Sequence, residues 1–366
     1  MLRQYKLSDY RFRLILWVIA LAVLGILVIG SANPDFQTRQ IFGLILGLAA
    51  MVFVSLMDYT WILNFHWLLY LSGVALLVSV LFLGKNVNGA TRWINIAGLQ
   101  FQPSDVVKIL LILFFAKFFE NHEENVSKPR IILSSLALIG VQLFLIYKEP
   151  DLSTTIAVAS VFCVMIFISG LSYRIVIGIL LVCIPVGVIG MSILLQPDNP
   201  SGNYQLKRIY AWLRPDEYPQ ESMQQQNSII AIGSGQLYGK GLNNDEVGSV
   251  KNGNFISEPQ TDFIFAVAGE EIGFIGCCIL IILEFLIAFE CLLIGRRAKL
   301  LSGTLICCGM AAQIFFQTFI NISVATGLMP NTGIALPFVS YGLTSLISFC
   351  IGIGFVLNVG LQTRKY

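Results

Sequence analysis

Three aspartates, Asp105, Asp151 and Asp262, each follow a proline by one to three residues at the start of an apolar run. Free backbone N–H groups and the helix dipole favour a carboxylate at a helix N-terminus, so helix capping explains each aspartate taken singly. In that interpretation Ser104 caps one helix with Asp105 in its first turn, and Asp262 caps its own helix. A carboxylate in such a place can also act as a general base when other polar groups meet it.

Cations accompany these aspartates along the chain. Lys108 lies one helical turn beyond Asp105, and a charge inside a membrane needs a partner, for which Asp105 is the obvious candidate. Carboxylates near cations at a membrane face suit a lipid-linked phosphate substrate, because cations hold phosphates and a carboxylate moves a proton. A purely solvated charge array is the alternative. The other cations are Arg39, Arg92 beside Trp93 in the polar segment 86–93, and Lys207, Arg208, Arg214, Lys240 and Lys251 in the long segment 196–261.

The elements that must position these residues are membrane helices. The chain has 366 residues, of which 56% are apolar and 12% charged, and this excludes a soluble enzyme, a disordered chain and a disulfide-stapled module. A membrane helix needs about 20 apolar residues, so we predict an all-α polytopic protein with about ten transmembrane helices. The apolar runs are 14–30, 41–57, 61–83, 105–119, 131–147, 152–169, 175–195, 263–294, 300–328 and 334–361. The run 263–294 is too long for one upright helix, so it must tilt, project from the membrane or break near Gly269, Gly273 or Gly276.

Basic residues predict the orientation, because they concentrate in the cytoplasmic loops of membrane proteins. The side of the termini carries Arg3, Lys6, Arg11, Arg13, Lys117, Lys128, Arg130, Arg174, Arg296, Arg297, Lys299, Arg364 and Lys365. The short loops opposite hold only Arg39, Lys85, Arg92, Lys108 and Lys148. We therefore expect both termini in the cytoplasm and one membrane domain, 1–366, whose large extracytoplasmic loop is 196–261.

Several other features receive no chemical role. All eight cysteines lie in apolar runs, and with only two histidines neither a disulfide framework nor a histidine-built metal centre is indicated. The segment 233–241 has the glycines of a phosphate loop, but Ser234 and Gly241 break the motif, so a flexible turn is the better interpretation. The near-neutral charge gives no sign of a nucleic-acid partner. The acids left without a role are Glu270, Glu271, Glu284 and Glu290.

Four segments, in this order, resemble the signature motifs of the SEDS family (shape, elongation, division and sporulation). They are 89–108, which contains GATRWI, FQPSD and Lys108; 149–154, EPDLST; 261–273, TDFIFAVAGEEIG; and 336–342, LPFVSYG. The short termini look more like the rod-shape branch than the division branch. Four positions depart from the family pattern: Asp105 replaces Glu, Glu149 replaces Gln, Gln260 stands where His is common, and Leu343 replaces Gly.

The resemblance implies a peptidoglycan glycosyltransferase in the bacterial cytoplasmic membrane, with its site on the outer face. Such an enzyme polymerises lipid II, inverts the anomeric carbon, releases polyprenyl diphosphate and partners a class B penicillin-binding protein in an elongation or division complex. The family counterpart of Asp262 is regarded as essential, and we predict that Asp262 is the catalytic base. The predicted substrate-binding residues are Arg39, Arg92, Trp93, Gln102, Asp105, Lys108, Arg208, Lys240, Glu258, Gln260, Thr261 and Ser340.

Alternatives stay open at this stage. A helix N-terminus would keep Asp262 ionised but lower its basicity, so Asp262 could instead orient the hydroxyl or bind Mg²⁺ or Mn²⁺. No cofactor is otherwise indicated. In place of an enzyme, the chain could be a lipid II flippase or a non-catalytic scaffold for a transpeptidase. Transporters place polar sites near the bilayer midplane, whereas the informative polar residues here gather at one face, which favours an enzyme.

Overall fold

The computed structural model describes residues 10–87, 90–96, 99–177, 204–243, 256 and 258–362. Most of the predicted apolar run 175–195 lies outside these residues, as do Lys251, Arg364 and Lys365. The described helices are α1 (Phe12–Ala32), α2 (Pro34–Leu56), α3 (Tyr59–Leu63), α4 (His66–Leu83), α5 (Pro103–Asn121), α6 (Pro129–Lys148), α7 (Leu152–Ile168), α9 (Tyr204–Leu213), α10 (Pro219–Ser234), α11 (Ile264–Arg296), α12 (Leu301–Ala325) and α13 (Leu343–Leu361), with a short 3₁₀ helix, η2 (Glu123–Asn125).

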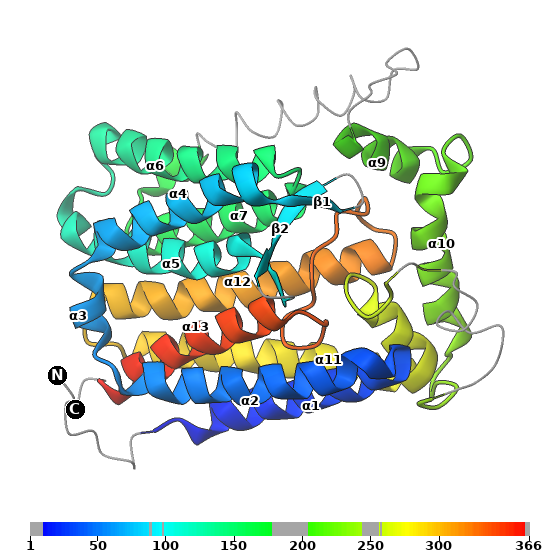
Figure 1. Ribbon diagram of the computed structural model, residues 1–366. Helices are drawn as coiled ribbons and strands as arrows, with labels where there is room; N and C mark the ends of the chain where they lie inside the picture. The colour runs from blue at the N-terminus through cyan, green and yellow to red at the C-terminus, as the bar shows by residue number, and fades with distance from the viewer. Residues whose placement is uncertain are drawn as a thin grey trace.

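The predicted helical membrane fold is confirmed. Seven of the described helices, α1, α2, α4, α6, α11, α12 and α13, are long and apolar enough to cross a membrane. The long helices run side by side, and the start of α1 and the end of α13 lie at the same end of the bundle (Figure 1). We call this the terminal end. The short helices α9 and α10 lie at the opposite end, which we call the site end.

α5 lies inside the bundle and is not among the seven, because it carries charges at both ends. Almost its whole length is buried, from Pro103 to Phe119, and it contacts α4, α7, α12 and α13. Pro103 occupies its first turn together with Asp105, as predicted. The predicted cap by Ser104 is wrong: Gln102 is the N-cap, and no side chain caps the helix, because Ser104 Oγ accepts from Gln102 Nε2 instead. Asp151, by contrast, does cap α7, accepting from the Thr154 N–H at 3.1 Å.

A small antiparallel sheet joins α4 to α5, in a segment from which only a polar loop was expected. Its strands are β1 (Lys85–Val87), β2 (Ala90–Ile96) and β3 (Leu99–Phe101), in the order β1-β2-β3. Lys85 pairs with Trp93, and Ile94 with Phe101. Residues 90–96 include β-branched and aromatic side chains, Thr91, Trp93, Ile94 and Ile96, which favour a strand. The all-α expectation missed these strands because each is far shorter than an apolar run.

Of the alternatives left open for the long apolar run, the structure shows a break, at Gly273, which has φ 66° and ψ −168° within α11. Residues of the glycine-containing segment 233–241 bond to the backbone on both sides of this break. The N–H groups of Phe274 and Ile275 donate to Gln236 and Leu237, while those of Lys240 and Gly241 donate to Glu270 and Glu271, all at 2.9–3.2 Å. The segment is thus a backbone clamp on α11 rather than the flexible turn that we expected.

α9 and α10 are fastened to the C-terminal end of α12. Gln225 Nε2 donates to the carbonyls of Val324 and Met329, and Ser228 Oγ donates to that of Ala325. Trp212 Nε1 donates to the carbonyl of Gly327 at 2.8 Å. The last carbonyls of a helix lack intrahelical partners, and Gln225 and Ser228 donate to two of them, those of Val324 and Ala325. The segment predicted as one large loop therefore contains two helices that sit on the end of the bundle.

Candidate functional site

A cavity of about 440 Å³ opens among the sheet, α5, α9 and the loops before α11 and α13. Eleven of the predicted site residues line it: Arg39, Arg92, Trp93, Gln102, Asp105, Lys108, Arg208, Glu258, Gln260, Thr261 and Asp262. The elements that carry them meet at the site end of the bundle (Figure 1). Residues that are far apart in the sequence therefore share one space, as the charge pattern predicted.

Two of the predicted substrate-binding residues do not line this cavity. Lys240 forms an ion pair with Glu270 at 2.9 Å on the backbone clamp. Ser340 is buried behind the cavity wall, where its Oγ donates to the carbonyl of Thr261 and accepts from the Leu336 N–H, both at 2.7 Å. The pattern of cations alone could not separate Lys240 from the site, because its partner lies 30 residues away in the sequence.

Asp262 lies two residues before α11, on a turn rather than on the helix. The N-cap of α11 is Phe263 and no side chain caps this helix, so the predicted capping by Asp262 is wrong. The side chain is half-buried in the cavity wall. Three hydrogen bonds hold the backbone of this turn: the carbonyls of Gln260, Thr261 and Asp262 accept from the Tyr341 N–H, from Ser340 Oγ and from Asn321 Nδ2.

Arg92 extends from β2 and is held by the turn between α6 and α7. Its Nε donates to the carbonyl of Glu149 at 3.3 Å, its Nη2 donates to the carbonyl of Pro150, and its Nη1 lies 3.8 Å from Asp151 Oδ1. This arrangement fixes a guanidinium on the cavity wall. A fixed cation suits binding of a phosphate group.

Gly333 allows Arg92 and Asp262 to approach the same point. A Cβ atom on Gly333 would lie 2.9 Å from Asp262 Oδ2 and 3.6 Å from Arg92 Nη1, and its φ of +68° is one that L side chains rarely adopt. Sequence reasoning missed this residue. Its only signal was the glycine itself, in the segment 331–334 between two apolar stretches.

The charges around Asp262 oppose one another. Burial raises the pKa of Asp262 above its ordinary value, while the positive charges of Arg92 and Arg208 offset part of that rise. Arg208 is held over the cavity from α9, where its Nη1 donates to the carbonyl of Asn331 at 3.1 Å. A carboxylate with a raised pKa is a stronger base than one at a helix N-terminus. Burial thus acts against the lowering of the pKa of Asp262 that the helix N-terminus would cause.

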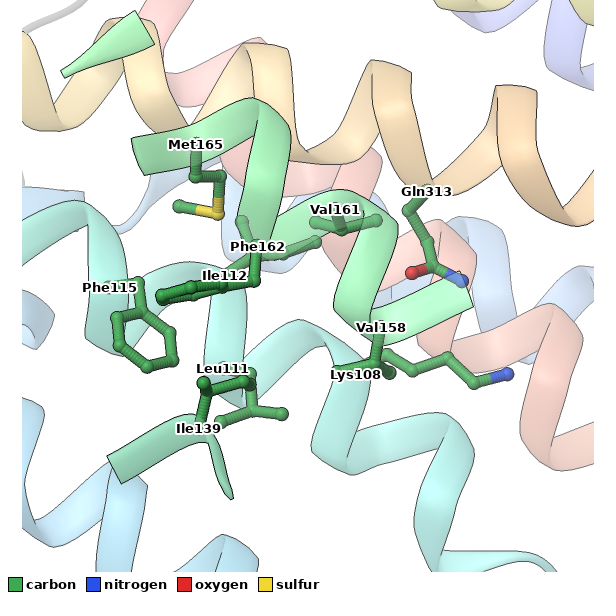
Figure 2. A pocket seen from close by; sticks show the side chains of 10 residues that line it. All are labelled: Lys108, Leu111, Ile112, Phe115, Ile139, Val158, Val161, Phe162, Met165 and Gln313. Atoms are coloured by element: carbon green, nitrogen blue, oxygen red, sulfur yellow. The ribbon is translucent and has the colours of Figure 1, made fainter. Parts of the chain in front are cut away.

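Asp105 and Lys108 form the predicted ion pair, with Nζ 2.8 Å from Oδ1. Both are buried, and the shorter side chain of Asp105 still reaches its partner. Lys108 Nζ also donates to Gln317 Oε1 at 3.3 Å. A second, mainly apolar pocket adjoins Lys108 between α5, α6, α7 and α12. Figure 2 shows the ammonium of Lys108 and the amide of Gln313 at one side of this pocket, with Phe115 and Met165 at the other.

The remaining lining residues were missed by sequence reasoning. They are Phe36, Asn95, Gln100, Thr154, Gly333, Ile334, Ala335, Tyr341, Gly342 and Leu343. A divalent cation would need several ligating side chains close together. Within the described ranges, no three His, Cys, Asp or Glu side chains are grouped so that they could hold a metal ion.

The four acids left without a role lie outside the cavity. Glu270 pairs with Lys240, and Glu271 Oε1 accepts from Ser31 Oγ at 2.5 Å. Glu284 is buried in α11, and neither of its carboxylate oxygens has a hydrogen-bond partner among the described residues. Glu290 lies 4.0 Å from Arg13 near the terminal end.

Known proteins resemble this chain over almost its whole length. The family model described as "Cell cycle protein", for FtsW, RodA and SpoVE, matches residues 11–365. The probable peptidoglycan glycosyltransferase FtsW of Aliivibrio salmonicida is 31% identical over 97% of this chain and 90% of its own length. Stage V sporulation protein E of Bacillus subtilis is 32% identical over 96% of this chain and 97% of its own length.

Solved structures share the fold. A chain from the structure described as "Structural coordination of polymerization and crosslinking by a peptidoglycan synthase complex" has a TM-score of 0.80 and 28% identity, covering 96% of this chain and 97% of that one. The rod shape determining protein RodA of Thermus thermophilus has a TM-score of 0.70 and 28% identity, covering 98% of both chains. The family match, the relatives and the shared fold agree with the motifs, and the chain belongs to the FtsW/RodA/SpoVE (SEDS) family of membrane proteins.

Proposed function

We propose that this protein is a peptidoglycan glycosyltransferase that polymerises lipid II into glycan strands. The names of its relatives support this activity. The observation that carries the proposal is the cavity itself, in which a half-buried carboxylate, Asp262, lies under the influence of two arginines, Arg92 and Arg208. A base beside fixed cations is what a sugar transfer from a lipid diphosphate requires.

The reaction is a single displacement at the anomeric carbon. The 4-hydroxyl of the acceptor N-acetylglucosamine attacks this carbon, the bond to the diphosphate oxygen breaks, and the configuration inverts. Asp262 takes the hydroxyl proton, which its raised pKa favours. Arg92 and Arg208, with Arg39 and Lys108, which also line the cavity, stabilise the negative charge that develops on the leaving diphosphate.

The site end faces outward from the cytoplasmic membrane in this proposal. The excess of basic residues at the terminal end supports a cytoplasmic position for the termini. The likeness to a chain of a peptidoglycan synthase complex supports a class B penicillin-binding protein as the partner, so that new strands are cross-linked as they form.

A lipid II polymerisation assay in detergent tests the function. Wild-type protein should make glycan strands, and Asp262→Asn, which keeps the shape of the side chain but cannot accept the proton, should make none while remaining folded. Asp216→Asn, at an exposed acid in the turn between α9 and α10, is the control and should stay active. Full activity of Asp262→Asn would remove this residue from the mechanism.

The same assay separates the alternatives. A flippase or a scaffold would yield no glycan strands in detergent, where there is no membrane to cross and no transpeptidase to support. Addition of a chelator tests whether a divalent cation takes part.

A further inference from the structure

α12 presents a row of three amide side chains on one face, Gln313, Gln317 and Asn321. The spacing of four residues places them one above another along the helix. All three are at most 1% exposed, although amides in the interior of a membrane protein are costly unless they are hydrogen-bonded. Sequence reasoning assigned these three residues no role. Their hydrogen-bond partners indicate one.

The row connects to three cavity-lining parts of the chain. Gln317 Oε1 accepts from Lys108 Nζ of α5 and from Gln313 Nε2, at 3.3 and 2.8 Å. Gln317 Nε2 donates to the carbonyl of Ala335, at 2.8 Å. α12 thereby holds the buried cation and the loop before α13 in one network.

Asn321 is the member of the row that contacts the Asp262 turn. Its Nδ2 donates both to the carbonyl of Asp262, at 2.9 Å, and to the carbonyl of Ile334, at 2.6 Å. Both partners are carbonyl oxygens, so only the NH₂ group can face them. Asn321 Oδ1 has no hydrogen-bond partner within the described residues. The side chain therefore donates two hydrogen bonds that join the Asp262 turn to the loop before α13.

We propose that Asn321 is a positioning residue for the glycosyl transfer, holding the carboxylate of Asp262 in place relative to Arg92 and, because α12 also carries the Gln317 partner of Lys108, relative to Lys108. This inference rests on the proposed function. Misplacement of a reacting group by about 1 Å can lower a rate about 100-fold. Other bonds hold the same turn, from Ser340 and from the Tyr341 N–H, so loss of Asn321 shifts the turn without releasing it.

The chain offers a matched control at the other end of the bundle. Asn358 of α13 is fully buried and also bridges two backbone groups, donating to the Ser55 carbonyl at 2.7 Å and accepting from the Tyr59 N–H at 3.0 Å. Asn358→Leu and Asn321→Leu each remove a buried amide of the same size. Of the two residues, only Asn321 contacts Asp262.

The experiment measures lipid II polymerisation per folded molecule for both variants. Asn321→Leu should lower kcat about 10- to 100-fold with KM within about threefold, since the carboxylate moves while the cations stay. Asn358→Leu should leave kcat within about twofold and lower only thermal stability. Asn321→Ser, whose short hydroxyl cannot reach both carbonyls, repeats the test if the leucine variant does not fold. An unchanged kcat in the folded Asn321 variants, or an equal loss in Asn358→Leu, would overturn the proposal.

A second measurement does not depend on activity. Infrared difference spectra, assigned with Asp262→Asn, follow protonation of the Asp262 carboxyl as pH changes. The cations lower the pKa of this group, so moving it away from them in Asn321→Ser should shift its titration to higher pH, and Asn358→Leu should not. A shift in a protein that makes no glycan would keep the positioning role and reject the proposed function. The absence of a shift in an active enzyme would do the opposite.

Discussion

Glu149 follows α6 directly as a fully buried acid, and neither of its carboxylate oxygens has a hydrogen-bond partner in the described part of the chain. Burial, together with the nearby charge of Asp151, raises the pKa of Glu149 to about 9, against a lowering by Arg92. An ionised Glu149 would compete for the charge of Arg92. In its neutral form it leaves that guanidinium to Asp151 and to a substrate phosphate.

The raised pKa of Glu149 predicts how stability depends on pH. The folded protein binds more protons than the unfolded chain between pH 4.5 and about 9, so the free energy of unfolding falls as pH rises through this window. At about pH 7.5 the loss amounts to at most about 4 kcal/mol. Glu149→Gln, neutral at every pH, should raise the melting temperature at pH 7.5 and change it little at pH 5. Glu124→Gln, at an exposed acid, is the control, and equal shifts at both pH values would contradict the prediction.

Substitution of Gly333 is expected to change the activity of the protein. Gly333→Ala places a methyl group 2.9 Å from Asp262 Oδ2, at a φ of +68°, and should lower glycan synthesis at least about 10-fold because the carboxylate must move. Gly170→Ala is a matched control: its φ is +105°, but no atom lies within 4 Å of the new Cβ. Both substitutions should cost about 1–2 kcal/mol of stability through backbone strain. Equal activity of the two variants would show that Gly333 matters only for folding.

Among the elements, the backbone clamp on α11 explains how a 33-residue helix can break without leaving polar groups unpaired. Segment 233–241 supplies carbonyls to the N–H groups after the break and N–H groups to the carbonyls before it. Its glycines are required where the two backbones touch. A Cβ on Gly239 would lie 2.2 Å from the Glu271 carbonyl oxygen.

This contact predicts different effects for two neighbouring glycines. Gly239→Ala should separate the clamp from α11 and speed hydrogen exchange at the amides of Phe274 and Ile275 by about 10-fold or more. Gly241→Ala also has a positive φ, +95°, but nothing lies within 4 Å of its Cβ, so exchange at these amides should be unchanged. Mass spectrometry of deuterium uptake measures both. Similar uptake in the two variants would mean that the clamp does not protect the break.

Across the whole molecule, the two ends of the helical bundle carry different elements. The site end holds the cavity, α9, α10 and the clamp, and the terminal end holds the start of α1 and the end of α13 (Figure 1). Tyr238 is 78% exposed in the clamp, and Glu124 is exposed between α5 and α6, near the terminal end. Cysteines placed at these two positions can therefore show which side of the membrane each end faces.

A membrane-impermeant maleimide tests this orientation on intact cells. Tyr238→Cys should react at once, and Glu124→Cys only after the membrane is made permeable, with the parent protein as the background for its own cysteines. The reverse pattern would place the cavity in the cytoplasm and reject a reaction on the outer face.

Local patterns in the sequence were sufficient for much of the fold. Apolar runs of membrane length predicted the helices, and the glycines at 269, 273 and 276 made a break one of three alternatives for the longest run, because both features depend on neighbours in the chain. The strand β2 was missed, since three short strands give a weaker signal than one apolar run. The pair of Asp105 and Lys108 was predicted because its members are one helical turn apart.

The sequence by itself therefore determined that the chain is a helical membrane protein, that three aspartates lie at or just before the starts of helices and, through the family resemblance, that Asp262 is the residue to test. Tertiary structure decided what Asp262 meets: Arg92 across Gly333, Arg208 from α9, and Asn321, which is 59 residues away along the chain. It also decided that Asp262 stands free of its helix and that Lys240 belongs to the clamp. Contacts within one helix follow from the spacing of residues in the sequence, whereas contacts between distant segments form only when the helices pack together.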